Sequence, residues 1–184
     1  MKLKIGFNVE DDVMLIEKVR ETIGSDMELM LDANHGYDAI DAIRLAQAAE
    51  HLDIRWFEEP VSPEDLDGYL AVKSATSIPI AGGETEYTRF GFREVIRQRA
   101  MDYLQPDICA AGGLSECKKI ADMANAYGIR FVPHVRVITI GDGRDDLVHA
   151  AQRICERVLN GQLRSEAVDE AVVEAELRAN LGFP

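Results

Sequence analysis

The chain has 184 residues, of which 47% are hydrophobic and 29% charged, and its formal net charge is −13. This length suits one domain with a sizeable core, and the acidity argues against nucleic acid as a partner because phosphate binding needs a basic face. We expect no membrane span and no signal peptide, since the sequence has no long apolar run. The three cysteines lack the spacing of metal ligands or disulfides, and this indicates reduced thiols in a cytoplasmic protein.

Short β-rich runs alternate with amphipathic helical stretches along the chain. The predicted elements, in order, are strand 2–5, helix 11–22, strand 28–31, helix 38–52, strand 54–57, helix 64–75, strand 78–81, helix 88–99, strand 103–105, helix 114–127 and strand 130–132. Asp38 and Ser62 are predicted N-caps, and Gly24 and Gly128 are predicted helix stops.

Repeated strand–helix units of this length predict parallel strands joined by right-handed crossovers. The fold class is therefore α/β, either a doubly wound open sheet or a (β/α) TIM-type barrel. A dinucleotide-binding sheet should carry a glycine-rich phosphate turn after an early strand, and none is found in the sequence. Polar residues instead follow the carboxyl ends of successive strands, where barrel active sites lie. We therefore favour the barrel.

The pattern changes from about residue 142, where two helices are expected over 147–159 and 165–181. We predict a partial barrel catalytic domain over 1–141 and a divergent helical tail over 142–184, packed on the barrel. Only about six strand–helix units are recognised where a closed barrel needs eight. Because six parallel strands leave two unpaired edges, we expect the chain to be marginally stable or a homo-oligomer.

Six ionisable residues follow the six predicted strands, one to each strand. They are Lys4, Asp32, Glu58, Glu84, Asp107 and His134. Neighbours in this series are separated by 23 to 28 residues, which is the length of one strand–helix–loop unit. Residues one unit apart lie side by side around the rim of a barrel, so the series predicts one shared pocket.

Three adjacent carboxylates, Asp32, Glu58 and Glu84, would repel one another without a counter-charge. A single surface acid is usually just solvated, but an ordered set on three successive strands indicates a hard divalent cation. Mg²⁺ prefers octahedral oxygen ligands and keeps open positions for water or a substrate carboxylate. We therefore predict an Mg²⁺ site.

The remaining groups are suited to proton transfer. Lys4 is expected opposite the acids, where nearby cations would lower its pKa and make it a base, and Lys2 shares its side of the strand and would assist this. Asp107 and His134 would lie on adjacent strands, so the carboxylate would hold the imidazole in one tautomer. Taken singly, two edge-strand lysines or one histidine are as often structural.

Six motifs together resemble the enolase superfamily, most closely its mandelate racemase / muconate lactonizing branch. They are Lys2-Leu3-Lys4-Ile5-Gly6, Leu31-Asp32-Ala33-Asn34, Trp56-Phe57-Glu58-Glu59-Pro60, Ile80-Ala81-Gly82-Gly83-Glu84, Gln105-Pro106-Asp107 and Val132-Pro133-His134. The resemblance runs from Lys2 to about Gly141. It implies that Lys4 is one acid/base and that Asp32, Glu58 and Glu84 are Mg²⁺ ligands.

The resemblance further implies that His134, oriented by Asp107, is the second acid/base and that Lys2 is a tuning cation. Asn34 would contact the substrate or a metal-bound water. His35, in the next position, could reach the substrate as well, although a loop histidine without a role is at least as common. Glu59 would lie behind the metal ligands, and Trp56 would either share the side of Glu58 or pack structurally.

The implied reaction is removal of the proton next to a carboxylate, with a metal ion holding the charge of the enediolate. We expect dehydration of a sugar acid to a 2-keto-3-deoxy acid. The alternatives are a racemase, epimerase or cycloisomerase of the same branch, or an inactive barrel fragment. The fragment reading stays open because no counterpart of the family's N-terminal capping domain, first barrel strand or eighth strand is recognised in the sequence.

Overall fold

The computed structural model describes residues 1–134, 172, 173 and 175. The described elements alternate between strands and helices along the whole of the first range. They are β1 (Lys2–Lys4), α1 (Val9–Ile23), β2 (Leu29–Asp32), α2 (Ala39–Ala49), the 3-10 helix η1 (Glu50–Leu52), β3 (Ile54–Glu58), α3 (Leu66–Ala75), β4 (Ile80–Gly82), α4 (Thr88–Gln98), β5 (Tyr103–Leu104), α5 (Leu114–Ala126) and β6 (Arg130–Phe131).

The six strands form one parallel sheet in the order β1-β2-β3-β4-β5-β6. The α/β class and the parallel order predicted from the sequence are confirmed. The sheet is curved but not closed, and β1 and β6 are its edges within the described residues. The register pairs Lys4 with Asp32 and Asp32 with Glu58 on neighbouring strands, so the ends of β1, β2 and β3 are level.

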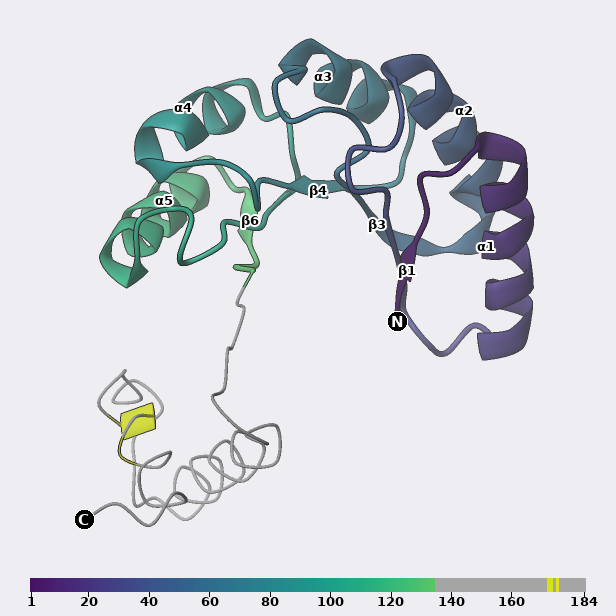
Figure 1. Cartoon of the computed structure of the whole chain (residues 1–184), viewed down its shortest axis with the longest axis horizontal. Helices are drawn as coiled ribbons and strands as arrows, with labels where there is room; N and C mark the ends of the chain where they lie inside the picture. The colour runs from purple at the N-terminus through teal and green to yellow at the C-terminus, as the bar shows by residue number, and fades with distance from the viewer. Residues whose placement is uncertain (135–171, 174, 176–184) are drawn as a thin grey trace. The chain divides into compact units, whose positions relative to one another are not determined.

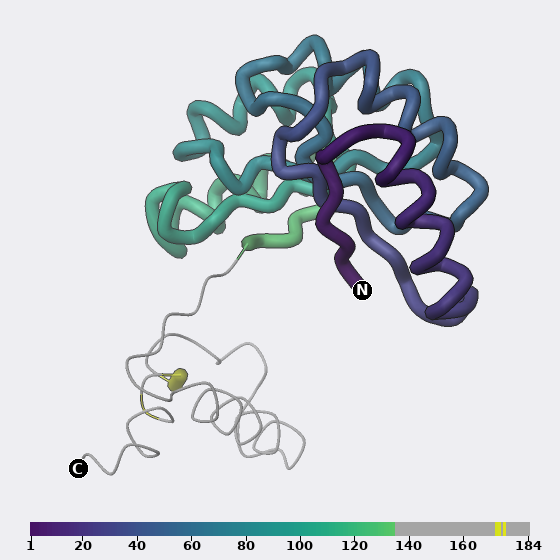
Figure 2. The backbone as a smooth tube through the Cα atoms, turned by 45° about the vertical axis from the view of Figure 1, so that its right-hand side comes forward, coloured from purple at the N-terminus to yellow at the C-terminus, as the bar shows by residue number. Residues whose placement is uncertain are grey.

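The helices α1 to α5 of residues 1–134 lie along the outer side of the sheet, as an arc that follows the strand order (Figure 1). The same arc is visible from the second direction (Figure 2). The core lies between the two layers. Its largest fully buried side chains include Leu29, Leu31, Phe57, Ile80 and Leu104 from the sheet, and Ile16, Leu45, Phe92, Ile96 and Ile120 from the helices.

Alternation along β2 explains how one strand serves both the core and the site. Leu29 and Leu31 are fully buried in the core layer, and Asp32, one position further, turns to the side where it contacts β1 lysines. Successive side chains of a strand point to opposite faces, so residues that face the helices cannot also face the inner surface. The inner surface of the curved sheet therefore carries the polar residues.

Several helix ends have clear local causes. Asp38 caps α2 by accepting from Asp41 N, as predicted. Gly24 ends α1 with φ +70° and its N–H donates to Arg20 O, also as predicted. The predicted N-cap Ser62 is wrong, because Asp65 caps α3 by accepting from Gly68 N. The Ser62 hydroxyl instead contacts Glu64.

The predicted tail, 142–184, lies outside the described residues except for 172, 173 and 175, so its helices and packing stay predictions. The chain divides into two compact units, Met1–Arg136 and Val137–Pro184. In the portion that the structure describes, no helix combines the length and apolar character that a membrane crossing requires.

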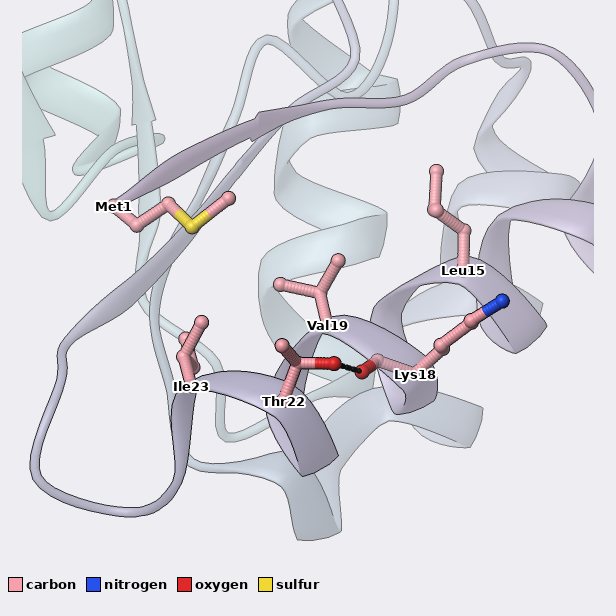
Figure 3. A pocket seen from close by; sticks show the side chains of 6 residues that line it. All are labelled: Met1, Leu15, Lys18, Val19, Thr22 and Ile23. Carbon is pink, nitrogen blue, oxygen red and sulfur yellow. Dashed lines mark hydrogen bonds between the residues drawn. The ribbon is translucent and has the colours of Figure 1, made fainter.

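A small apolar pocket lies between Met1, at the start of the edge strand β1, and the side of α1 (Figure 3). Its volume is about 300 Å³, and its lining is Met1, Leu15, Lys18, Val19, Thr22 and Ile23. Met1 and Leu15 are 49% and 39% exposed, although both are apolar. The pocket has the character of a packing surface, because its lining contains one charged side chain and no carboxylate.

Candidate active site

Lys2 and Lys4 pair with the carboxylates of the two neighbouring strands. Lys2 Nζ lies 2.7 Å from Glu58 Oε1 and 3.1 Å from Asp32 Oδ2. Lys4 Nζ lies 2.5 Å from Asp32 Oδ2. Lys4 was expected opposite the acids, but the register places it directly beside Asp32. Both carboxylates are 2% exposed, so the two ammoniums supply the local counter-charge for buried acids.

These contacts shift the pKa values of both partners. Burial alone would raise the pKa of Asp32, but the contacts with Lys4 and Lys2 outweigh it and hold this pKa below its ordinary value. Burial would lower the pKa of Lys2, but Glu58 and Asp32 outweigh it and raise that pKa. Among the residues that the structure describes, none makes a hydrogen bond of good geometry to Asp32 Oδ2, and this oxygen is balanced there by the charges of Lys2 and Lys4.

Glu58 is also held by two neutral donors on the inner surface of the sheet. Its Oε2 atom accepts from Trp56 Nε1 at 2.9 Å and from Gln105 Nε2 at 3.0 Å. Trp56 additionally packs against Tyr103, with the ring centroids 5.2 Å apart. Trp56 therefore shares the side of Glu58 and also packs structurally, so the structure shows both of the roles that the sequence suggested. The sequence indicated no separate role for Gln105, because its contact with Glu58 joins the end of β5 to the end of β3 across the intervening β4.

A second group joins Asp107, His134 and Glu84. His134 Nδ1 lies 3.0 Å from Asp107 Oδ2, and His134 Nε2 lies 3.7 Å from Glu84 Oε2. Asp107 Oδ1 accepts the N–H groups of Cys109 and Ala110. The Ala110 N–H and then His134 hold the pKa of Asp107 below its ordinary value. Asp107 is thus an ionised carboxylate that can fix the ring orientation of His134.

The two predicted substrate contacts lie in the turn after β2. Asn34 is exposed, and its backbone N–H donates to Asp32 Oδ1 at 3.1 Å. The ring of His35 contacts protein with both nitrogens, because Nδ1 lies 3.1 Å from Val61 O and Nε2 lies 3.1 Å from Glu59 Oε2. Glu59 is buried, and burial followed by repulsion from Glu84, Asp32 and Glu58 raises its pKa to about 8.

The donor set suits a hard cation by residue type. Asp32, Glu58 and Glu84 come at the ends of three neighbouring strands, and the buried oxygen Asp32 Oδ2 has no hydrogen bond from any residue that the structure describes. Within the described residues, however, no group of three or more His, Cys, Asp and Glu side chains lies in an arrangement that could hold a metal ion. Asp32 and Glu58 share Lys2, whereas Glu84 faces His134. The Mg²⁺ site stays a prediction.

Comparison with known proteins supplies the family. The family model described as "Enolase C-terminal domain-like" matches residues 1–173. D-galactarolactone cycloisomerase from Agrobacterium fabrum is 53% identical over 134 residues, which are 73% of this chain and 35% of that protein. Arabinonate dehydratase from Saccharolobus solfataricus is 38% identical over 135 residues, which are 73% of this chain and 36% of that protein. The chain spans about a third of the length of these curated relatives.

Solved structures give the same result. The 3,6-anhydro-D-galactonate cycloisomerase from Zobellia galactanivorans has a TM-score of 0.73 and 43% identity, covering 79% of this chain and 48% of that one. An L-talarate dehydratase from a Polaromonas species, solved with Mg and L-glucarate, has a TM-score of 0.71 and 35% identity, covering 73% of this chain and 38% of that one. The sheet, the order of its strand ends and these matches together show that the chain belongs to the enolase C-terminal domain-like family.

Proposed function

We propose that this chain carries an Mg²⁺-dependent site that removes the proton α to the carboxylate of a sugar acid and then expels the β-oxygen. The observation that carries the proposal is the grouping of Lys2 and Lys4 with Asp32 and Glu58 on adjacent strands, beside the Asp107–His134 pair. The names of the relatives support a sugar acid as substrate and the magnesium-bound neighbour supports the metal.

In this proposal Asp32, Glu58 and Glu84 hold the metal, which acts as a Lewis acid toward the substrate carboxylate. Lys4, released from its ion pair with Asp32 and in its neutral form, takes the α-proton, and an enediolate forms on the substrate. The bond from the β-carbon to its oxygen then breaks. His134, held by Asp107, donates the proton that the departing oxygen needs. Asn34 is proposed to contact the substrate.

Two outcomes of this elimination are distinguished by the fate of the β-oxygen. If it is a free hydroxyl, it leaves as water, and the resulting enol becomes a 2-keto-3-deoxy acid, which is dehydration. If it is closed in a ring, the ring opens and no atoms are lost, which is an isomerisation. Dehydration is the first candidate, and the 53% identity to a cycloisomerase favours the second outcome as the alternative. Return of the proton to the opposite face would instead give racemisation.

A panel of sugar acids and their lactones tests this proposal. The chain is incubated with each compound and Mg²⁺ in deuterated water, where ¹H NMR follows loss of the α-proton signal. Parallel reactions in ordinary water are followed by mass spectrometry for a loss of 18 Da (the mass of one water). Dehydration predicts both changes, ring opening predicts a 2-keto product at unchanged composition, and racemisation predicts exchange alone. Lys4→Met and His134→Asn should abolish turnover, whereas Lys18→Met, on the exposed side of α1, should not.

The absence of α-proton exchange with every compound in the panel would contradict the proposal for this chain.

We further propose that the protein acts in the cytoplasm and assembles as a homo-oligomer. The apolar pocket between Met1 and α1, where Met1 and Leu15 are exposed, supports assembly. Size-exclusion chromatography with light scattering tests it, and a purely monomeric species would refute it.

A further inference from the structure

His35 and Glu59 join the two turns that directly follow proposed metal ligands. His35 lies three residues after Asp32, and Glu59 is the residue after Glu58. The His35 N–H donates to Glu59 O at 2.8 Å, and the side chains meet at 3.1 Å between His35 Nε2 and Glu59 Oε2. The same ring contacts Val61 O at 3.1 Å. His35 therefore connects the turn after β2 to the segment after β3 at three points, two through its ring and one through its backbone N–H.

The two groups that contact the His35 ring, Val61 O and the Glu59 carboxyl group, determine where the ring carries its hydrogens. A carbonyl oxygen only accepts, so His35 Nδ1 must carry a hydrogen to bond Val61 O. Nε2 then shares one proton with the Glu59 carboxyl group, as an imidazolium beside a carboxylate or as a neutral ring beside a carboxylic acid. The contact closes in either form. The Glu59 side chain is 2% exposed, and among the described residues its other oxygen, Oε1, has no hydrogen-bond partner. The His35 ring is therefore the side-chain partner of this buried group, at Oε2.

The backbone at this junction adopts conformations that need outside support. Asn34, His35 and Glu59 have φ values of 46°, 64° and 46°, in the left-handed region that side chains disfavour. All three follow a strand end that carries a proposed ligand, and Ala33 N donates to Glu58 O across the same junction. Such conformations persist where surrounding contacts support them, and the contacts of His35 and Glu59 join the turns at this point.

We propose that His35 and Glu59 are positioning residues that fix the turns after β2 and β3 to each other, and thereby set the spacing of the Asp32 and Glu58 carboxylates for the cation. The inference rests on the proposed metal site. It assigns His35 to support of the ligands, because a ring engaged by protein at both nitrogens must give up a contact before it can reach a substrate.

The test compares Mg²⁺ affinity, by titration calorimetry, in the wild type and five variants of the full chain. His35→Ala and Glu59→Leu each break the connection, and loss of such a supporting contact should weaken Mg²⁺ binding about tenfold or more. The double variant should bind Mg²⁺ no less tightly than the single variant with the lower Mg²⁺ affinity, because the two substitutions remove the same contact. Glu59→Gln can still donate an amide N–H to His35 Nε2 and should stay within about threefold of the wild type. His51→Ala, in the exposed part of η1, is the matched control.

Amide hydrogen exchange separates this inference from the metal site itself. His35→Ala and Glu59→Leu should speed exchange at residues 33–36 and 59–61 together, with no change in α5. If the wild-type chain binds no Mg²⁺, the proposed function fails, and exchange alone decides the connection. Unchanged exchange in these turns would overturn the inference, and so would Mg²⁺ affinities equal to that of His51→Ala. Weakened Mg²⁺ binding with unchanged exchange would also overturn it, because His35 would then act directly on the ligand.

Discussion

Replacing Lys2 by Met removes the cation shared by two buried carboxylates, Asp32 and Glu58. The lysine side chain is 35% exposed, whereas both carboxylates are 2% exposed. Breaking a fully buried pair costs about 3–5 kcal/mol, and an exposed pair contributes about 0–1 kcal/mol. Because Lys2 is part-exposed and Lys4 still pairs with Asp32, we expect an intermediate loss of about 2 kcal/mol. Met retains most of the apolar stem, so little packing is lost.

For a chain of this size, a loss of about 2 kcal/mol lowers the melting temperature by roughly 4–8 °C. Added Mg²⁺ should then stabilise Lys2→Met more than it stabilises the wild type, because a bound cation supplies the missing charge and no longer competes with Lys2. Thermal melts with and without Mg²⁺ measure both effects, and Lys18→Met is the control. If Lys2→Met and Lys18→Met melt at the same temperature without Mg²⁺, the ion-pair argument is refuted. If Mg²⁺ raises the melting temperature of Lys2→Met and of the wild type by the same amount, competition between Lys2 and Mg²⁺ is refuted.

Three further predictions concern other contacts of the site and its frame. Asp107→Asn should lower turnover on the reactive sugar acid about 100-fold or more, because the variant lacks the carboxylate charge that orients His134. Its melting temperature should not change, and undiminished turnover would contradict the role of Asp107. Glu59 has its pKa raised from 4.5 to about 8, so the folded state retains a proton that the unfolded state loses. This contribution is complete below pH 4.5 and declines as pH rises toward 8, by at most about 1.4 kcal/mol per pH unit. Urea unfolding at pH 6 and pH 8 should show this slope in the wild type and not in Glu59→Gln. Tyr37→Phe should cost about 1–3 kcal/mol in urea unfolding, because buried Asp12 Oδ2 accepts from Tyr37 Oη and from the N–H groups of Gly6 and Phe7; an unchanged midpoint would count against that role.

The strands and their common direction could be predicted because each strand carries a strong local signal. Leu29 and Leu31 are fully buried and alternate with residues of the inner face, which is a pattern visible in the sequence. Helix boundaries were less predictable. The first helix begins at Val9 rather than Asp11 because Asn8 accepts from Asp11 N and so caps a helix that already includes the acidic turn. Which of several polar residues caps a helix depends on geometry that spacing does not encode.

The site could be predicted as a set of residues but not as a set of contacts. Equal spacing along the chain indicated which strand ends lie together, and the pairing of His134 with Asp107 followed from adjacent strands. The pairing of Lys4 with Asp32 depends on the register of β1 on β2. The partners of His35 lie 24 and 26 positions further along the chain, and two of the three contacts are to backbone carbonyls, for which a sequence carries no residue-type signal.

The central claim is that one divalent cation is bound jointly by Asp32, Glu58 and Glu84. A crystal structure of the chain grown with Mg²⁺ tests it most directly. We expect a single ion with an oxygen of each of the three carboxylates at about 2.0–2.1 Å, and with the ammoniums of Lys2 and Lys4 displaced from Asp32 Oδ2. A structure in which the lysines keep their ion pairs at saturating Mg²⁺, or in which Glu84 takes no part in binding the ion, would contradict it.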